Sequence, residues 1–169
     1  MTKWIIVSDN HTEKGILFDV FNHYEEVDVA LHLGDSEFTY DDTELSYYHK
    51  VKGNTDFYQE FPNDLLITEN GINAYVTHGH LFQVNQSRER LADTAKRKGC
   101  QFAFYGHTHV AKYELLDGVH VINPGSISQS RSEIEETYAE LIISDDNASA
   151  TLNFCNRNHQ IIDSKDFEI

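Results

Sequence analysis

The chain has 169 residues, with 13 basic against 28 acidic side chains and a formal net charge of −15. This length is typical of one domain, and we expect residues 1–169 to form a single domain. The acidic balance argues against an extended nucleic-acid surface and against docking on an anionic membrane, because both require a basic face. Two prolines and nine glycines exclude collagen-like and Pro/Gly-rich disordered classes.

Membrane insertion and disulfide bonding are not indicated by the sequence. No apolar run reaches the length of a transmembrane helix, and the opening residues do not have the pattern of a signal peptide. Cys100 and Cys155 form no CxxC motif, and we interpret them as reduced core thiols. These features predict a cytoplasmic protein.

The first third of the chain predicts a strand–helix–strand unit. Lys3–Ser8 and Val27–Leu33 are apolar runs typical of buried strands. Between them, Thr12 is a candidate cap for a helix. The apolar face of this helix comprises Ile16, Leu17, Val20 and Phe21. The order implies parallel strands joined by a crossover. A second helix is expected over Thr39–Lys50, with Thr39 and Asp42 as a capping box.

The rest of the chain predicts short strands and one further helix. Asn70-Gly71 and Asp117-Gly118 are strong signals for hairpin turns. The helix is expected from about Gln86 to Lys98 and ends at Gly99. The strands are expected at Leu65–Thr68, Ala74–Thr77, Gln101–Tyr105, Val110–Leu115, Val119–Ile122, Thr137–Ile143 and Ala148–Phe154. This pattern indicates an α/β protein with a pair of sheets.

Side chains of the types that bind metals are concentrated in the loops that follow the predicted strands. Loops beyond the carboxyl ends of parallel strands converge on one crevice, so we expect these side chains to meet there. The seven candidates are Asp9, His11, Asp35, Asn54, His78, His107 and His109.

Each of these motifs also has an ordinary structural explanation. Asp9 and His11 are typical of a turn or helix cap, Gly34-Asp35 of a turn, and Gly53-Asn54 of a left-handed turn. If all these explanations held together, several histidines and aspartates would be buried at strand ends without partners, and a shared cation removes that cost. The other histidines, which have no such neighbours, are interpreted as structural or surface residues: His23, His32, His49, His120 and His159.

Seven ligands are too many for one tetrahedral zinc and suit two ions that share one carboxylate. Mixed imidazole, carboxylate and amide donors favour Mn, Fe, Zn, Co or Ni over Mg or Ca. Two such ions about 3.5–4 Å apart generate a bridging hydroxide and hold both oxygens of an in-line displacement. The pattern therefore points to hydrolysis of a phosphate ester.

The motifs, taken together, resemble the calcineurin-like metallophosphoesterase superfamily, and within it the small YfcE-like phosphodiesterases. They occur in the family's order over roughly residues 5–126. In this sequence they read Asp9-Asn10-His11, Gly34-Asp35, Gly53-Asn54-Thr55-Asp56, Thr77-His78-Gly79-His80, Gly106-His107-Thr108-His109 and Asn123-Pro124-Gly125-Ser126.

The resemblance implies a four-layer α-β-β-α sandwich of two mixed sheets, with the site at one end of the sheets. It assigns the first metal to Asp9, His11 and His109 and the second to Asn54, His78 and His107, with Asp35 as the bridge. The expected cofactors are two divalent transition-metal ions, manganese first. The bridging hydroxide would attack phosphorus while Asn54 stabilises charge on the phosphoryl oxygens.

One departure from the family concerns the leaving group. Many members carry a histidine at the position of Thr55, where it can protonate the leaving oxygen. Thr55 does not do this near neutral pH, and general acid catalysis typically contributes about 10²–10⁴-fold. We therefore expect a preference for phosphodiesters with good leaving groups, such as aryl esters. His80 is an alternative proton donor, although a supporting role beside the ligands is the more ordinary interpretation. Thr12 replaces a glycine that is frequent in relatives.

Two alternatives stay open at this stage. One is a phosphomonoesterase or nucleotide pyrophosphatase on the same site, and the other is a non-catalytic scaffold like the retromer subunit that shares the fold but lacks a complete ligand set. The acidic surface favours a small phosphate ester over DNA or RNA as the substrate. A homodimer is a prior expectation from how common symmetric pairs are.

Overall fold

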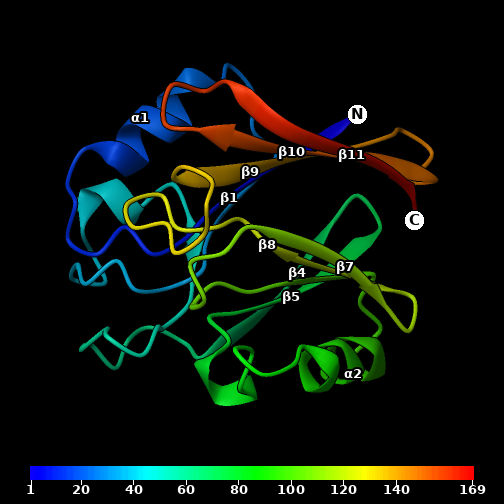
Figure 1. The fold of residues 1–169 in the computed structure, drawn as a ribbon, viewed down its shortest axis with the longest axis horizontal. Helices are drawn as coiled ribbons and strands as arrows, with labels where there is room; N and C mark the ends of the chain where they lie inside the picture. Colours follow the sequence, from blue (N-terminus) through cyan, green and yellow to red (C-terminus); the bar gives the residue numbers. More distant parts are fainter.

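The computed structural model describes residues 1–169 and consists of two stacked β-sheets with a helix on each outer face (Figure 1). The first sheet has the strand order β11-β10-β9-β1-β2-β3. Its strands are β1 (Thr2–Val7), β2 (Val29–His32), β3 (His49–Lys50), β9 (Thr137–Ile143), β10 (Ser149–Asn156) and β11 (Ile161–Glu168). Helix α1 (Ile16–His23) covers this sheet.

The second sheet has the order β4-β5-β6-β8-β7 and is covered by helix α2 (Glu89–Arg97). Its strands are β4 (Asp64–Glu69), β5 (Ile72–Thr77), β6 (Phe102–Phe104), β7 (Lys112–Leu116) and β8 (Val119–Asn123). Both sheets are mixed: β1 pairs parallel with β2 and antiparallel with β9, and β8 pairs parallel with β6 and antiparallel with β7. The expected four-layer sandwich of two mixed sheets is confirmed.

The continuous apolar run of β1 is explained by burial on both of its faces. Successive side chains of a strand point to opposite faces. Trp4 and Ile6 therefore enter the core between the sheets, whereas Ile5 and Val7 pack against α1. All four side chains are fully buried, as is typical of strands covered on both sides.

The expected helix over Thr39–Lys50 is wrong. This segment contains only a short 3₁₀ turn, η1 (Thr43–Leu45), before β3 begins at His49. Asp42 does cap this turn, since its carboxylate accepts a hydrogen bond from the Glu44 N–H at 2.9 Å. The segment is fixed instead by Glu44, whose buried carboxylate bonds a different part of the chain.

That carboxylate explains why Thr12 does not cap α1. The helix begins at Ile16 after Gly15, which has no side chain to cap it. Glu44 accepts hydrogen bonds from the backbone N–H groups of Gly15 at 3.0 Å and Leu17 at 2.8 Å. It thus satisfies donors that a helix leaves free at its start. The Thr12 N–H donates to the Ser36 carbonyl at 3.0 Å and belongs to a neighbouring loop.

Strand β11 was not expected from the sequence. It pairs antiparallel with β10 at the edge of the first sheet and is largely exposed, with Phe167 packed against the central core. Few residues of β11 are apolar, and they do not alternate regularly with polar ones, so the hydrophobic pattern of a strand is weak. The short strand β3 was also not expected, because it lies within the predicted helix over Thr39–Lys50. The remaining strands agree with expectation apart from shifts of their ends, and helix α2 begins at Glu89 rather than Gln86.

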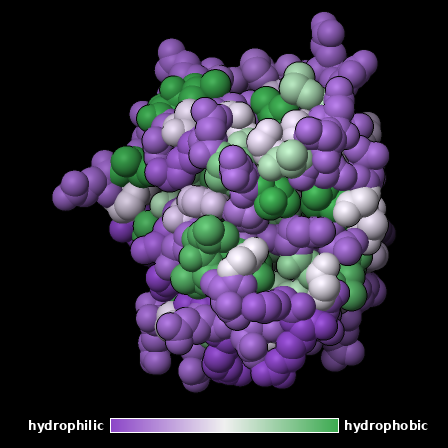
Figure 2. Space-filling view, turned by 90° about the vertical axis from the view of Figure 1, so that its right-hand side faces the viewer, coloured by the Kyte–Doolittle hydropathy of each residue, from purple (hydrophilic) through white to green (hydrophobic).

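Cys100 and Cys155 are buried free thiols. The face shown in Figure 2 is mostly hydrophilic, with small separate hydrophobic patches. No helix is both long enough and apolar enough to cross a lipid bilayer.

Candidate metal centre

The loops that carry the candidate ligands meet at one end of the two sheets. Asp9 follows β1, Asp35 follows β2 and Asn54 follows β3, all in the first sheet. His78 follows β5, and His107 and His109 follow β6, in the second sheet. The parallel strands end at the same edge, so loops far apart in the sequence converge, as expected for an α/β sheet.

The first group comprises Asp9, His11 and His109, whose candidate ligand atoms all lie within 4.8 Å of one another. The Nε2 atoms of His11 and His109 are 3.1 Å apart. Asp9 Oδ1 lies 3.3 Å from His109 Nε2 and 3.6 Å from His11 Nε2. These three atoms lie close enough together for a single ion to contact all of them.

The second group comprises Asp35, His78 and His107. Asp35 Oδ2 lies 3.2 Å from His78 Nε2. Asn54 joins this group, because its Oδ1 is 3.0 Å from His78 Nε2 and 3.0 Å from His107 Nδ1. The groups adjoin, since Asp35 Oδ2 is 3.9 Å from His11 Nε2 and Asp9 Oδ1 is 3.9 Å from His78 Nε2. The structure thus brings all seven expected residues together, with Asp35 between the groups.

Backbone carbonyls determine the tautomers of two of the histidines. His78 Nδ1 is 2.7 Å from the Leu33 carbonyl, and His109 Nδ1 is 2.7 Å from the Gln129 carbonyl. A carbonyl only accepts, so each Nδ1 carries the hydrogen and, in the neutral ring, Nε2 presents its lone pair. These lone pairs face carboxylate oxygens. Acceptors facing acceptors repel, and a cation between them turns this repulsion into coordination.

The Asp9 carboxylate gives a second test of whether a cation fits. Its Oδ2 accepts hydrogen bonds from the Ser8 hydroxyl and from the His107 N–H. Its Oδ1 is buried and has no hydrogen-bond partner. A buried carboxylate oxygen without a partner is costly, and this atom points at the imidazoles of the first group. A cation beside this oxygen would remove that cost, and the donor set around Asp9 fits divalent transition metals.

The charges at the site favour ionised carboxylates. Burial disfavours the ionised form of Asp9, but the neighbouring imidazoles of His109 and His11 outweigh this and hold the pKa of Asp9 well below its usual range. Burial likewise opposes a charged His78, yet Asp35 and Asp9 raise the pKa of that imidazole. Burial lowers the pKa of His107. The carboxylates of Asp9 and Asp35 are thus both ionised at neutral pH.

The backbone around the ligands is unusually constrained. Asp9, Asp35, His107 and His109 all have positive φ, at 59°, 60°, 72° and 61°. Left-handed backbone in residues other than glycine is uncommon and clusters at functional sites, where the surrounding structure must enforce it. Gly53 permits one such approach, because a Cβ there would lie 2.0 Å from Asp35 Oδ1.

Asp56 holds the ligand loops in place, a role that the sequence did not reveal. Its carboxylate accepts hydrogen bonds from the backbone N–H groups of Asp35 at 2.8 Å, Gly53 at 2.7 Å and Glu37 at 2.9 Å. Glu37 itself lies 3.5 Å from His11 Nδ1. Asp56 stands in the Gly53-Asn54-Thr55-Asp56 motif, but its backbone partners are defined only by the folded loops.

The histidines interpreted as structural do not join the ligand groups. Among them, His32 supports the ligand loops through hydrogen bonds. It is buried, and its Nε2 lies 2.8 Å from Asn10 Oδ1. Its Nδ1 accepts a hydrogen bond from the Gly34 N–H at 3.1 Å. Burial lowers the pKa of His32 to about 4, so it is neutral at pH 7. It supports the loops before Asp9 and Asp35.

His80 and Thr55 border the site. The His80 ring lies 5.5 Å from His78 and 6.2 Å from His107 between centroids, and its buried Nδ1 has no hydrogen-bond partner. Thr55 is exposed, and its N–H donates to Asp35 Oδ1 at 2.9 Å. His80 therefore stays a candidate proton donor.

Comparisons with known proteins agree with this architecture. The model of the calcineurin-like phosphoesterase superfamily domain matches residues 2–146. The chain is 38% identical over 151 residues to the probable metallophosphoesterase YsnB of Bacillus subtilis (strain 168), covering 89% of this chain and 88% of that protein.

Solved structures show the same fold. A conserved uncharacterised protein and predicted phosphoesterase from Streptococcus pneumoniae TIGR4 superposes with a TM-score of 0.94 at 34% identity, covering 99% of this chain and 98% of that one. The phosphoesterase YfcE from E. coli superposes with a TM-score of 0.70 at 20% identity, covering 97% and 98%. We conclude that the chain belongs to the calcineurin-like phosphoesterase superfamily and is a metal-dependent hydrolase of phosphate esters.

Proposed function

We propose that this protein hydrolyses small phosphodiesters with the help of two divalent transition-metal ions, and that manganese is the preferred metal. The observation that carries the proposal is the pair of adjoining ligand groups, in which buried carboxylate oxygens and imidazole lone pairs face one another. The mixed nitrogen and oxygen donors suit manganese as well as iron, zinc, cobalt or nickel.

The geometry supports a division of the ligands between two ions. Asp9, His11 and His109 would hold the first, and Asn54, His78 and His107 the second, with Asp35 between them. When bound, the ions would supply an activated water and neutralise negative charge on the phosphoryl group.

Asn54 is the group of this chain best placed to contact the phosphate directly. Its side chain is exposed at the site, and its Oδ1 is directed at His78 and His107. The two amide hydrogens on Nδ2 are therefore left to donate toward a phosphoryl oxygen. Such a donor stabilises the charge that builds up on that oxygen during the reaction.

The proton needs of the reaction favour diesters with acidic leaving groups. Hydrolysis breaks one P–O ester bond, and the oxygen that leaves must be stable as an anion or take up a proton. Thr55 is exposed beside Asn54, and its hydroxyl is too weak an acid to protonate a leaving group near neutral pH. Aryl oxygens leave readily without protonation, whereas alkyl oxygens do not.

The test is metal-dependent hydrolysis of bis(p-nitrophenyl) phosphate by the purified protein. We expect stoichiometric transition metal, turnover with Mn²⁺, loss of turnover with EDTA, and loss in an Asp35→Asn variant that still folds. Slower turnover of p-nitrophenyl phosphate would distinguish a diesterase from a monoesterase. A protein that binds no second ion in excess manganese and leaves the diester intact would be a scaffold, and the proposal would be wrong.

A further inference from the structure

A cavity of about 340 Å³ borders the loop that carries His107 and His109. Its wall includes Thr108, the residue between these two ligands, together with Arg88, Lys112 and Arg131. The backbone N–H of Arg131 donates to the His109 carbonyl at 3.0 Å. The cavity and the metal centre therefore share one loop.

The charge of this cavity is opposite to that of the whole molecule. The chain has a net charge of −15 and only 13 lysines and arginines, yet three of them line this cavity and no acidic side chain does. Arg88 is held by Glu114, with bonds of 2.8 Å from Nε and 3.1 Å from Nη2. Lys112 and Arg131 have no carboxylate partner. The positively charged side chains of Lys112 and Arg131 are thus available to bind a ligand.

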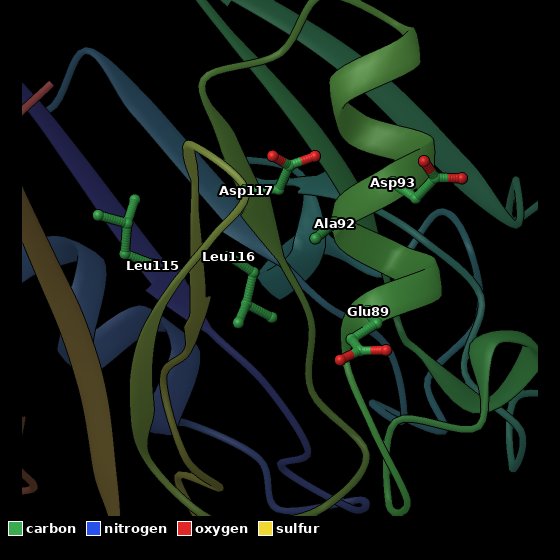
Figure 3. A pocket seen from close by; sticks show the side chains of 6 residues that line it. All are labelled: Glu89, Ala92, Asp93, Leu115, Leu116 and Asp117. Carbon is green, nitrogen blue, oxygen red and sulfur yellow. The ribbon is translucent and has the colours of Figure 1, made fainter.

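A second cavity shows that this charge is local. The cavity of about 320 Å³ between α2 and the β7–β8 hairpin is bordered by the carboxylates of Glu89, Asp93 and Asp117 (Figure 3). Glu89 and Asp93 project from α2, and Asp117 lies at the hairpin turn. This surface would repel a phosphate. An anion at the surface is therefore favoured beside the ligand loop and disfavoured between α2 and the β7–β8 hairpin.

Other groups at the basic cavity suit a phosphate-bearing ligand. The hydroxyl of Tyr105 and the amide of Asn85 belong to lining residues and add hydrogen-bonding groups to the cavity. A guanidinium binds phosphate oxygens in a fork, and an ammonium adds a point charge. The Arg88–Glu114 pair fixes one wall of the cavity.

We propose that this cavity binds a second phosphate group of the substrate, so that the preferred substrates are small phosphodiesters with a separate terminal phosphate. The inference rests on the proposed function, because the diester itself would lie at the metal centre. Lys112 and Arg131 would hold the terminal phosphate.

The test compares two substrates that share one diester bond. The dinucleotide pApA carries a 5′-terminal phosphate, and ApA lacks it. We expect kcat/KM of the manganese-loaded wild type to be about 10- to 100-fold higher for pApA, the size of a charge-assisted contact. In Lys112→Ala/Arg131→Ala this ratio should fall close to one. The matched control Arg97→Ala/Lys165→Ala removes the same charge elsewhere and should keep the wild-type ratio.

Binding to EDTA-treated protein gives a readout that does not need turnover. Calorimetric titration should show tighter binding of pApA than of ApA in the wild type, and the difference should disappear in Lys112→Ala/Arg131→Ala. If bis(p-nitrophenyl) phosphate is not hydrolysed, the proposed function fails, and this titration alone decides whether the anion site exists.

Two results would overturn the inference. One is an equal preference for pApA and ApA in the wild type. The other is that inorganic phosphate binds the wild type and not Lys112→Ala/Arg131→Ala, while both proteins bind pApA with the same affinity. The cavity would then be a site for a free anion.

Discussion

At the scale of single residues, the contact between Gly53 and Asp35 decides whether the second ligand group can form. A Cβ at position 53 would lie 2.0 Å from Asp35 Oδ1 and 2.4 Å from the Asp35 backbone nitrogen. Both distances are shorter than non-bonded contacts of a Cβ atom. Gly53→Ala should therefore displace Asp35 and reduce both the bound manganese and kcat/KM, by about 10- to 100-fold if the ion of the second group is lost.

Metal content and turnover of folded protein check this prediction. Gly99→Ala is a suitable control, because position 99 has φ +75° but open space around it. The control should lose about 1 kcal/mol of stability through backbone strain and keep its metal. Normal manganese content in Gly53→Ala would contradict the role given to Asp35.

We expect Thr55 to create a requirement for a good leaving group, because its hydroxyl is too weak an acid to protonate the leaving oxygen. Thr55→His should raise the rate on alkyl diesters by about 10- to 100-fold, because an imidazole can protonate the leaving oxygen. Rates on aryl esters should change little, so the dependence of rate on leaving-group pKa becomes shallower.

The slope of log kcat/KM against leaving-group pKa measures this effect. Thr55→Asn is the matched variant without an acid, and its slope should equal that of the wild type. A wild type that already handles alkyl diesters well, with no gain in Thr55→His, would show that another group supplies the proton.

Prediction from sequence was most successful at this scale, for a physical reason. Asp9, His78 and His107 could be chosen because their chemical types are unusual directly after buried strands. Asp56 and Glu37 could not, because their effects depend on which backbone N–H groups or rings the folded loops bring to them. The seven candidate ligands do lie together, and their coordination of metal is still a prediction.

At the scale of elements, α1 depends on a carboxylate from another segment. Glu44→Ala would leave the N–H groups of Gly15 and Leu17 without their partner in a buried place. We expect a loss of roughly 1–3 kcal/mol in the free energy of unfolding. Urea denaturation measures it.

Exposed Glu26 gives the control for this prediction, since Glu26→Ala removes the same charge and should change stability by less than about 0.5 kcal/mol. Equal stabilities of the two variants would show that α1 does not need Glu44.

The same contact explains why the region over Thr39–Lys50 was misjudged. Its side chains match a helical pattern, but burying Glu44 against the start of α1 stabilises a different backbone path. Strand β11 was missed for a related reason. Its pairing with β10 supplies the stabilisation, and its own exposed residues give little apolar periodicity.

At the scale of the whole molecule, the candidate ligands connect the two sheets. Asp9, Asp35 and Asn54 follow strands of the first sheet, and His78 and His107 follow strands of the second. Ions that bind only the folded protein stabilise it by mass action, by about 2.7 kcal/mol at a free concentration of 100 times Kd. For a chain of this size we expect Tm to rise by roughly 5–10 °C.

Calorimetry with and without EDTA checks this expectation in the wild type. The variant Asp9→Asn, tested at the same manganese concentration, should show a much smaller rise. An equal rise in both would place the stabilising ion elsewhere.

The tilted contact between the rings of Trp4 and Phe104, whose centroids are 5.9 Å apart, joins the strands that lead to Asp9 and to His107. Both rings are fully buried in the core between the sheets, so their volume contributes to the spacing between the loops that carry Asp9 and His107. Trimming either ring would let one layer settle toward the other. The distance between the Asp9 carboxylate and the His107 imidazole would then change although neither side chain had been altered. Core packing would thus contribute to the affinity of the centre for a cation.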